Sequence, residues 1–149
     1  MGTPVRQNIV DNMYTVLAGI TTASGFKTTV STVEILGKVW SQVPKGLRPW
    51  VGIFPRSTKY QYLPANRVRG VFRIAIIAHV APGTMAAKRE SLNDLEDDIF
   101  AALNADTTRN LNAISTTIVE TETDEGDPES EGSMVIEVDV AYLRTTGST

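Results

Sequence analysis

The side chains that could do acid–base chemistry in this sequence are one histidine and two pairs of carboxylates. His79 could serve as a general base, and Glu120 with Glu122, or Glu137 with Asp139, could act as paired carboxylates. His79 lies in an apolar stretch with no Ser, Cys or acidic residue nearby, which favours a half-buried strand histidine with one hydrogen-bond partner. For the carboxylates, a solvated sheet face is the simpler interpretation. The wall of a water-filled channel is the alternative.

The sequence has no motif of a phosphate-binding loop, a serine hydrolase or a zinc protease. It contains no cysteine, which excludes disulfides, thiolate metal sites and a cysteine nucleophile. Its single histidine excludes the common multi-histidine metal sites. Nothing in the sequence therefore supports an enzyme, a bound metal or a cofactor.

The segment 124–132 is unusually acidic, with carboxylates at Asp124, Glu125, Asp127, Glu129 and Glu131. The ligand spacing of an EF-hand is absent. A solvated hairpin loop is the simplest interpretation. A docking loop, or one that faces a lumen, is the alternative.

Basic and aromatic residues are interleaved between positions 48 and 73. They are Arg48, Trp50, Arg56, Lys59, Tyr60, Tyr62, Arg67, Arg69 and Arg73. This composition is typical of protein interface cores, where Tyr, Trp and Arg are enriched. A plain solvated β-ribbon and a site for single-stranded nucleic acid are the alternatives. The net charge of −3 argues against nucleic acid, because such domains are usually basic.

The stretch 67–104 predicts a strand followed by a helix. Positions 68–80 are apolar and β-branched, and Pro82-Gly83 ends that strand. Ser91 is predicted to open an amphipathic helix that ends near Asn104 and Asp106, with Asp94 close to a capping box.

The remaining pattern predicts a helix that begins at Val5, after Pro4 and a Thr3 cap. Its apolar stripe reaches Ile20, Gly19 weakens its end, and Ser24-Gly25 terminates it. Strands are predicted at 26–33, 114–123 and 134–143. Positions 34–43 are ambiguous between helix and loop. A strand at 50–54 is expected to extend into a long twisted hairpin that reaches Val80, with a turn at Ala65-Asn66.

Together these elements predict an α+β fold in one domain over residues 1–149. We expect a single mixed or antiparallel sheet of about five strands, with two helices packed on one face and a long β-hairpin arm. The other face would be partly open, and residues 145–149 would form a disordered tail. We see no signal peptide, and the apolar run 74–78 is too short to cross a bilayer.

Taken end to end, the chain resembles the tail terminator proteins of long-tailed bacteriophages, similar in kind to the minor tail protein U and tail-completion families. The resemblance rests on the order of an N-terminal amphipathic helix (RQNIVDNMYTVLAGI), a proline-led strand (RPWVGIFP), a strand that runs into an acidic helix (FRIAIIAHVAPG, then LNDLEDDIFAAL), and a closing acidic hairpin (ETETDEGDPESEG, then VIEVDVAYLRT). It covers nearly the whole chain.

The resemblance implies a non-enzymatic virion protein without a cofactor, assembled in the host cytoplasm. Such proteins form a homohexameric ring that caps the tail tube, stops its polymerisation and provides the surface joined to the head. The implied partners are other copies of the chain, the tail tube protein, a head-completion or neck protein and, in a contractile tail, the sheath protein. DNA would pass through the lumen without specific binding, and no membrane is involved.

Two sets of residues are expected to serve this function. Subunit or tube contacts are expected at Trp50, Arg56, Lys59, Tyr60, Tyr62, Arg67, Arg69 and Arg73. Acidic docking or lumen positions are expected at Asp94, Asp97, Asp98, Asp124, Glu125, Asp127, Glu129, Glu131, Glu137 and Asp139. The alternatives are another neck, tail-completion or tube protein of the same virion, or a small α+β module that binds a ligand or nucleic acid.

Overall fold

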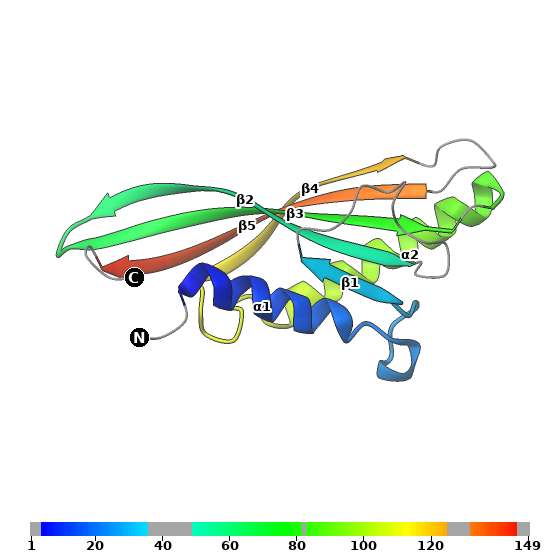
Figure 1. Ribbon diagram of the computed structural model, residues 1–149, viewed down its shortest axis with the longest axis horizontal. Coiled ribbons are helices and arrows are strands. Elements are labelled where there is room, and N and C mark those ends of the chain that lie inside the picture. Colours follow the sequence, from blue (N-terminus) through cyan, green and yellow to red (C-terminus); the bar gives the residue numbers. More distant parts are fainter. Residues whose placement is uncertain (1–3, 36–48, 82, 125–131, 146–149) are drawn as a thin grey trace.

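The computed structural model describes residues 4–35, 49–81, 83–124 and 132–145. One five-stranded mixed sheet runs the length of an elongated molecule, and both long helices lie on the same side of it (Figure 1). The strands lie in the order β1-β2-β3-β5-β4. β1 pairs parallel to β2, and all other neighbours pair antiparallel. The predicted α+β fold with two helices on one face is confirmed.

The N-terminal helix α1 spans Val5–Ala18 and buries the predicted apolar stripe, in which Ile9, Met13 and Leu17 are fully buried. Pro4 stands at its N-cap position without a side-chain cap. A short 3-10 turn, Thr22–Ser24, follows and ends at Gly25, whose φ of 96° suits glycine.

The first strand is shorter and later than the sequence suggested. β1 spans only Thr32–Ile35, whereas positions 26–31 form an irregular segment. The backbone of that segment is bonded to the second long helix, α2 (Met85–Ala105), instead: the N–H groups of Lys27 and Thr28 donate to Asp98. The predicted strand at 26–33 is therefore wrong for most of its length. The ambiguous region 34–43 lies outside the described residues after Ile35.

The central hairpin is formed by β2, Trp50–Leu63, and β3, Arg67–Val80. Ala65 and Asn66 make the turn with positive φ values of 64° and 59°. At its proline, β2 is bulged, since the register shifts between Pro55 and Thr58. A free-standing arm is not confirmed, because β3 pairs with β5 along its whole length.

The second helix, α2, spans Met85–Ala105 and starts six residues before the predicted Ser91. Thr84 is its N-cap, and the Thr84 hydroxyl accepts a hydrogen bond from the N–H of Ala87. Ser91 lies inside the helix, so the predicted cap is wrong. The expected stripe is confirmed: Leu92, Leu95, Ile99 and Leu103 are all buried.

The last two strands are β4, Ser115–Asp124, and β5, Gly132–Thr145. The predicted alternation in β5 is confirmed, since its even-numbered residues from 134 to 142 are buried in the core. In β4 the register shifts between Ile118 and Glu120. This bulge moves Glu120 and Glu122 to the face opposite Thr116 and Ile118, whereas the sequence pattern placed all four on one face.

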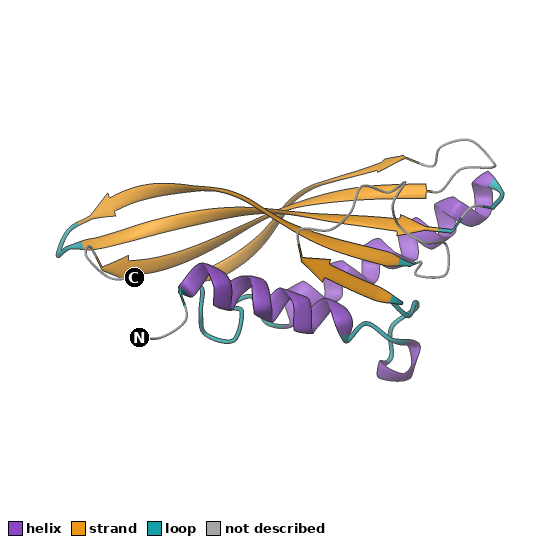
Figure 2. Ribbon diagram, in the orientation of Figure 1, coloured by secondary structure: helices purple, strands orange, loops and turns teal. Residues whose placement is uncertain are grey.

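The core lies between the helices and the sheet (Figure 2). We call this the helix-covered face, and the opposite one, over which no described helix lies, the open face. Strand residues alternate between the two faces. Ile74 and Ile76 of β3 join the core cluster, while Arg73 and Ala75 point to the open face.

Candidate functional site

The residues predicted as an interface all lie on the β2–β3 hairpin. At its outer end Tyr62 is 77% exposed and Tyr60 50% exposed. Lys59 and Arg67 are also exposed, and Arg69 is half-buried. None of these three cations forms an ion pair within the described part of the chain. This end of the hairpin is therefore a surface that can contact another molecule.

Trp50 differs from the other predicted interface residues, because it is fully buried within the chain. Its indole stacks on the His79 ring, with centroids 5.2 Å apart and the planes at 25°. It also covers Gly52, where an added Cβ would come within 2.4 Å of the tryptophan ring. Trp50 and His79 thus have a packing role, and the chain supplies no exposed indole at this position.

The acidic pair predicted on β5 is neutralised by cations of the same chain. The Arg73 guanidinium donates two hydrogen bonds to Asp139, one of them at 3.1 Å. Glu137 lies 3.6 Å from Arg56 and 3.9 Å from Arg73. The hydrogen bond to Asp139 raises the pKa of Arg73 above its ordinary value. Arg56 and Arg73 are therefore engaged within the chain rather than free for a neighbouring copy.

The pleat of the sheet separates the cations of the hairpin from its tyrosines. Lys59 and Arg69 lie on the open face, because Lys59 pairs with Val71 and Gln61 with Arg69. Tyr60 and Tyr62 lie on the helix-covered side, beside Gly70 and Val68. Base stacking combined with phosphate contacts needs aromatic and cationic groups on one surface. The hairpin does not offer that combination.

A third tyrosine, Tyr142 of β5, lies on the same side of the sheet as Tyr60 and Tyr62. The Tyr142 ring lies against Gly70, where an added Cβ would be 2.8 Å from the ring. Burial raises the pKa of the Tyr142 hydroxyl, and the neighbouring Tyr60 hydroxyl adds to this effect. The exposed Tyr60 and the buried Tyr142 thus lie on either side of Gly70.

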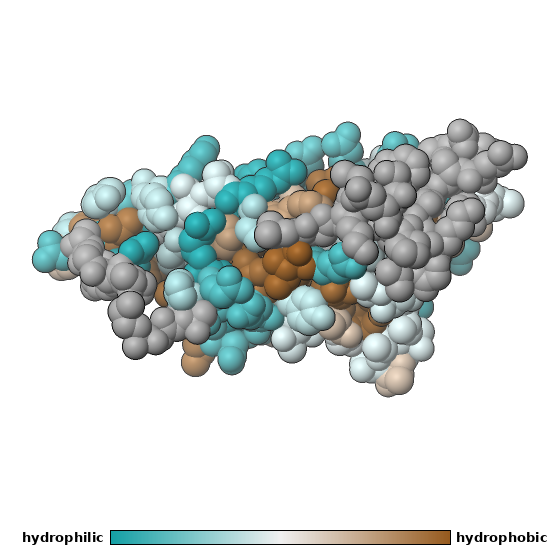
Figure 3. Space-filling model, in the orientation of Figure 1, coloured by the Kyte–Doolittle hydropathy of each residue, from teal (hydrophilic) through white to brown (hydrophobic). Residues whose placement is uncertain are grey.

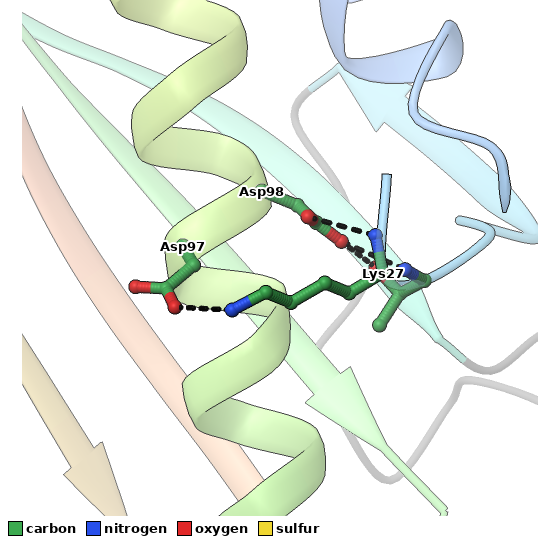
Figure 4. A network of polar contacts seen from close by, with 4 residues as sticks. Lys27, Asp97 and Asp98 are labelled. Carbon is green, nitrogen blue, oxygen red and sulfur yellow. Dashed lines mark hydrogen bonds and ion pairs between the residues drawn. The ribbon is translucent and has the colours of Figure 1, made fainter. Parts of the chain in front are cut away.

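The acidic group on α2 serves mainly to attach the segment before β1 (Figure 4). Asp98 is 4% exposed and accepts hydrogen bonds from Lys27 N at 3.1 Å, Thr28 N at 2.8 Å and Thr28 Oγ1 at 2.5 Å. Asp97 pairs with the Lys27 ammonium at 2.8 Å, which raises the pKa of Lys27. Asp98 is thus a buried structural carboxylate rather than a lumen position, while Asp94 remains half-buried.

The predicted acidic loop lies mostly outside the described residues. This applies to Glu125, Asp127, Glu129 and Glu131. Asp124 is described: it is exposed at the end of β4, on the open face, opposite Ser133. Glu122 lies on the same face opposite Val135, so the edge of the sheet is acidic here.

The turn after α2 contains a buried arginine that sequence reasoning missed. Arg109, Asn110 and Leu111 have positive φ values of 50°, 57° and 68°. The Arg109 guanidinium is fully buried and donates to the carbonyl oxygens of Leu103 and Asp106, which ends the helix. Burial lowers the pKa of Arg109. The one available signal was Asp106 two residues before Thr108, a pairing typical of side-chain-stabilised turns.

A cavity of about 300 Å³ lies near the start of α2, lined chiefly by Pro49, Val80, Ala81 and Ala87. Its charged lining residue is Lys88, which is itself buried and already has a partner. None of the residues predicted from sequence as sites lines this cavity.

Two further searches cover the described residues. They contain no cluster of three or more His, Asp or Glu side chains placed to bind a metal ion. None of the described helices is both long enough and apolar enough to span a membrane. In comparisons with known proteins, no family model and no curated protein matches the chain.

Proposed function

We propose that this protein is a structural protein of a bacteriophage virion that forms a closed ring at the end of the tail tube. The ring ends tail polymerisation and presents the surface to which the head or neck is joined. The resemblance to tail terminators implies that the ring has six copies of the chain. The protein would act without enzymatic chemistry, in the tail of the virion, after assembly in the host cytoplasm.

The observation that carries this proposal is that the open face has cations on one side of the sheet and carboxylates on the other. β2 and β3 place cations there, and β5 and β4 place carboxylates there. The cations are Arg56, Lys59, Arg67, Arg69 and Arg73, and the carboxylates are Glu120, Glu122, Asp124, Glu137 and Asp139. A molecule with one basic side and one acidic side associates head to tail. Such contacts make a ring when the rotation between copies closes.

Much of the surface in view is hydrophilic, with a hydrophobic area near the centre of the molecule (Figure 3). The charges in the middle of the sheet compensate one another through the pairs of Arg56 and Arg73 with Glu137 and Asp139. Lys59 on one side and Glu122 on the other form no ion pair within the described residues, so they remain for contacts between molecules. Electrostatic complementarity of this kind sets orientation and specificity.

The ring has a place for each proposed partner. The tube protein would meet one end of the ring, and a neck protein the other. In a contractile tail the sheath would meet the outside. Glu137, Asp139 and Asp97 are each paired with a cation of the same chain, so they are weak candidates for repelling DNA phosphates in a lumen.

The proposal is tested by measuring the mass of the purified protein by light scattering and by imaging the same fraction in negative stain. We expect six-fold rings, or a monomer that assembles when tube protein is present. Added to polymerising tube protein of the same virus, it should shorten the tubes and occupy one end. A monomer that leaves tube length unchanged would overturn the proposal.

A further inference from the structure

We propose that the outer half of β2 in one copy pairs with the β4 edge of the next copy, so that one β-sheet continues from subunit to subunit. This inference rests on the ring of the proposed function and assigns the surface that closes it. The first surface, the basic edge, is residues 58–63 of β2. The second, the acidic edge, is residues 120–124 of β4.

Both edges have unpaired backbone in the described structure. β1 pairs with β2 only from Trp50 to Ile53, which leaves residues 58–63 of β2 bonded to β3 alone. β4 is the last strand in the sheet order and is bonded to β5 alone. Unpaired N–H and C=O groups on a long edge are a template for another strand. Each copy therefore has one edge to offer on each side.

The strand directions fit this pairing. β2 and β5 are both antiparallel to β3, and β4 is antiparallel to β5. β4 therefore runs opposite to β2. A neighbour whose strands run in the same directions, with its β4 beside β2, would add that β4 as an antiparallel strand. In a ring, successive copies are related by a rotation that must close. The register places residues 58–63 and residues 120–124 at opposite ends of the strands, so the neighbouring copy is also displaced along the strand direction.

The side chains at the two edges are complementary on the open face. The basic edge carries Lys59, and Arg67 lies one strand further in, on β3, opposite Leu63 at the hairpin end. The acidic edge carries Glu120 and Glu122. All four side chains lie on the open face, where Lys59 would face the acidic edge directly and Arg67 would approach it from the next strand. Opposite charges on paired strands stabilise a sheet, whereas like charges destabilise it.

Apolar groups flank the same edges. Tyr60 and Tyr62 are 50% and 77% exposed on the helix-covered side of the basic edge. Next to the acidic edge, Val119 in the β4 bulge is 48% exposed. Aromatic side chains beside aliphatic ones are typical of interface cores. The joint thus combines backbone hydrogen bonds, charge pairs and apolar contact.

The test uses two charge-reversed variants and their combination. The basic-edge variant is Lys59→Glu with Arg67→Glu, and the acidic-edge variant is Glu120→Lys with Glu122→Lys. Each should lose ring formation, because both edges then carry the same charge. A protein with all four substitutions should form rings again. So should an equal mixture of the two variants, since alternating copies close a ring with an even number of members.

A matched control for the acidic-edge variant makes the same change in net charge but leaves the edges alone. Asp11→Lys with Glu90→Lys changes two exposed carboxylates on the helices and should still form rings. Circular dichroism and thermal unfolding of every variant establish that each is folded. If wild type assembles only on tube ends, the same series is scored by tube capping instead.

The outcomes separate this inference from the function. Wild-type rings or capping that survive in both edge variants would overturn the edge pairing and leave the proposed function standing. Loss in both variants without rescue in the combination or mixture would also overturn it. A wild-type protein that neither forms rings nor caps tubes would overturn the proposed function together with the inference.

Discussion

At the scale of single residues, aspartates that accept several hydrogen bonds hold separate segments of the chain together. Asp98 is buried and accepts from two backbone N–H groups and one hydroxyl. Removing the carboxylate would take the partner from three donors at a part-buried site, and a donor left unsatisfied costs more than a hydrogen bond contributes. The adjacent Asp97 makes one exposed ion pair with Lys27. Asp98 is therefore expected to contribute much more to the stability of the fold than the adjacent Asp97.

We therefore expect Asp98→Ala to lower the free energy of unfolding by roughly 2 to 4 kcal/mol. Asp97→Ala is the matched control and should lower it by only a small fraction of that, because exposed pairs contribute little. Urea denaturation of the two variants measures the difference. Equal losses would contradict the structural role assigned to Asp98.

Asp106 gives the stability a dependence on pH. Hydrogen bonds from the Thr108 hydroxyl and from the N–H groups of Asn110 and Thr108 lower the pKa of Asp106 from 3.8 to about 2. The folded state therefore favours the ionised carboxylate. This stabilisation is present above pH 4 and is lost as the pH falls towards 2.

The variant Asp106→Asn should accordingly be less stable than wild type at pH 7, and the difference should shrink between pH 4 and pH 2. Urea denaturation of both proteins at pH 7, 4 and 2.5 measures this. A difference that stays constant over that range would show that the Asp106 charge is not coupled to folding.

At the scale of elements, the start of α2 shows how local signals compete. Ser91 followed by Asp94 resembles a cap, but Thr84 is the residue whose hydroxyl accepts a backbone N–H. The intervening turn contains Ala86, Ala87 and Lys88, which are good helix formers. This first turn of α2 carries no apolar stripe, so hydrophobic periodicity alone does not predict that the helix begins there.

We expect Thr84→Ala to destabilise the protein by about 1 kcal/mol, the usual effect of losing an N-cap. Ser91→Ala should have almost no effect or be slightly stabilising, because alanine is the better residue inside a helix. Thermal unfolding of both variants tests where the helix begins. A larger loss for Ser91→Ala would contradict the observed boundary.

At the scale of the whole molecule, the charge separation across the open face predicts that assembly depends on salt. Raising ionic strength from about 0.1 M to 1 M shortens the screening length from about 10 Å to 3 Å. Rings joined by Lys59 and Arg67 against Glu120 and Glu122 should then dissociate at higher protein concentration. Sedimentation velocity over a salt series measures this. Association that strengthens with salt would indicate an interface dominated by apolar contact.

The sequence by itself determined those features that depend on local periodicity. Alternation of apolar residues in 134–142 predicted the buried face of β5, and spacing of three and four residues predicted the buried stripes of both helices. Ala65-Asn66 between two extended runs predicted the turn of the hairpin. These signals are local, because one buried face imposes a period of 2 on a strand and of 3.6 on a helix.

Only the tertiary structure decided which distant residues meet. Arg73 and Asp139 are 66 positions apart and become partners because β5 lies between β3 and β4. The bulge after Ile118 moves Glu120 and Glu122 to the open face, and no residue type in β4 predicts that bulge. The 26–31 segment has strand-like composition, yet the carboxylate of Asp98 takes its N–H groups. Strand order, register and buried hydrogen bonds are set by packing between segments, which a linear pattern does not contain.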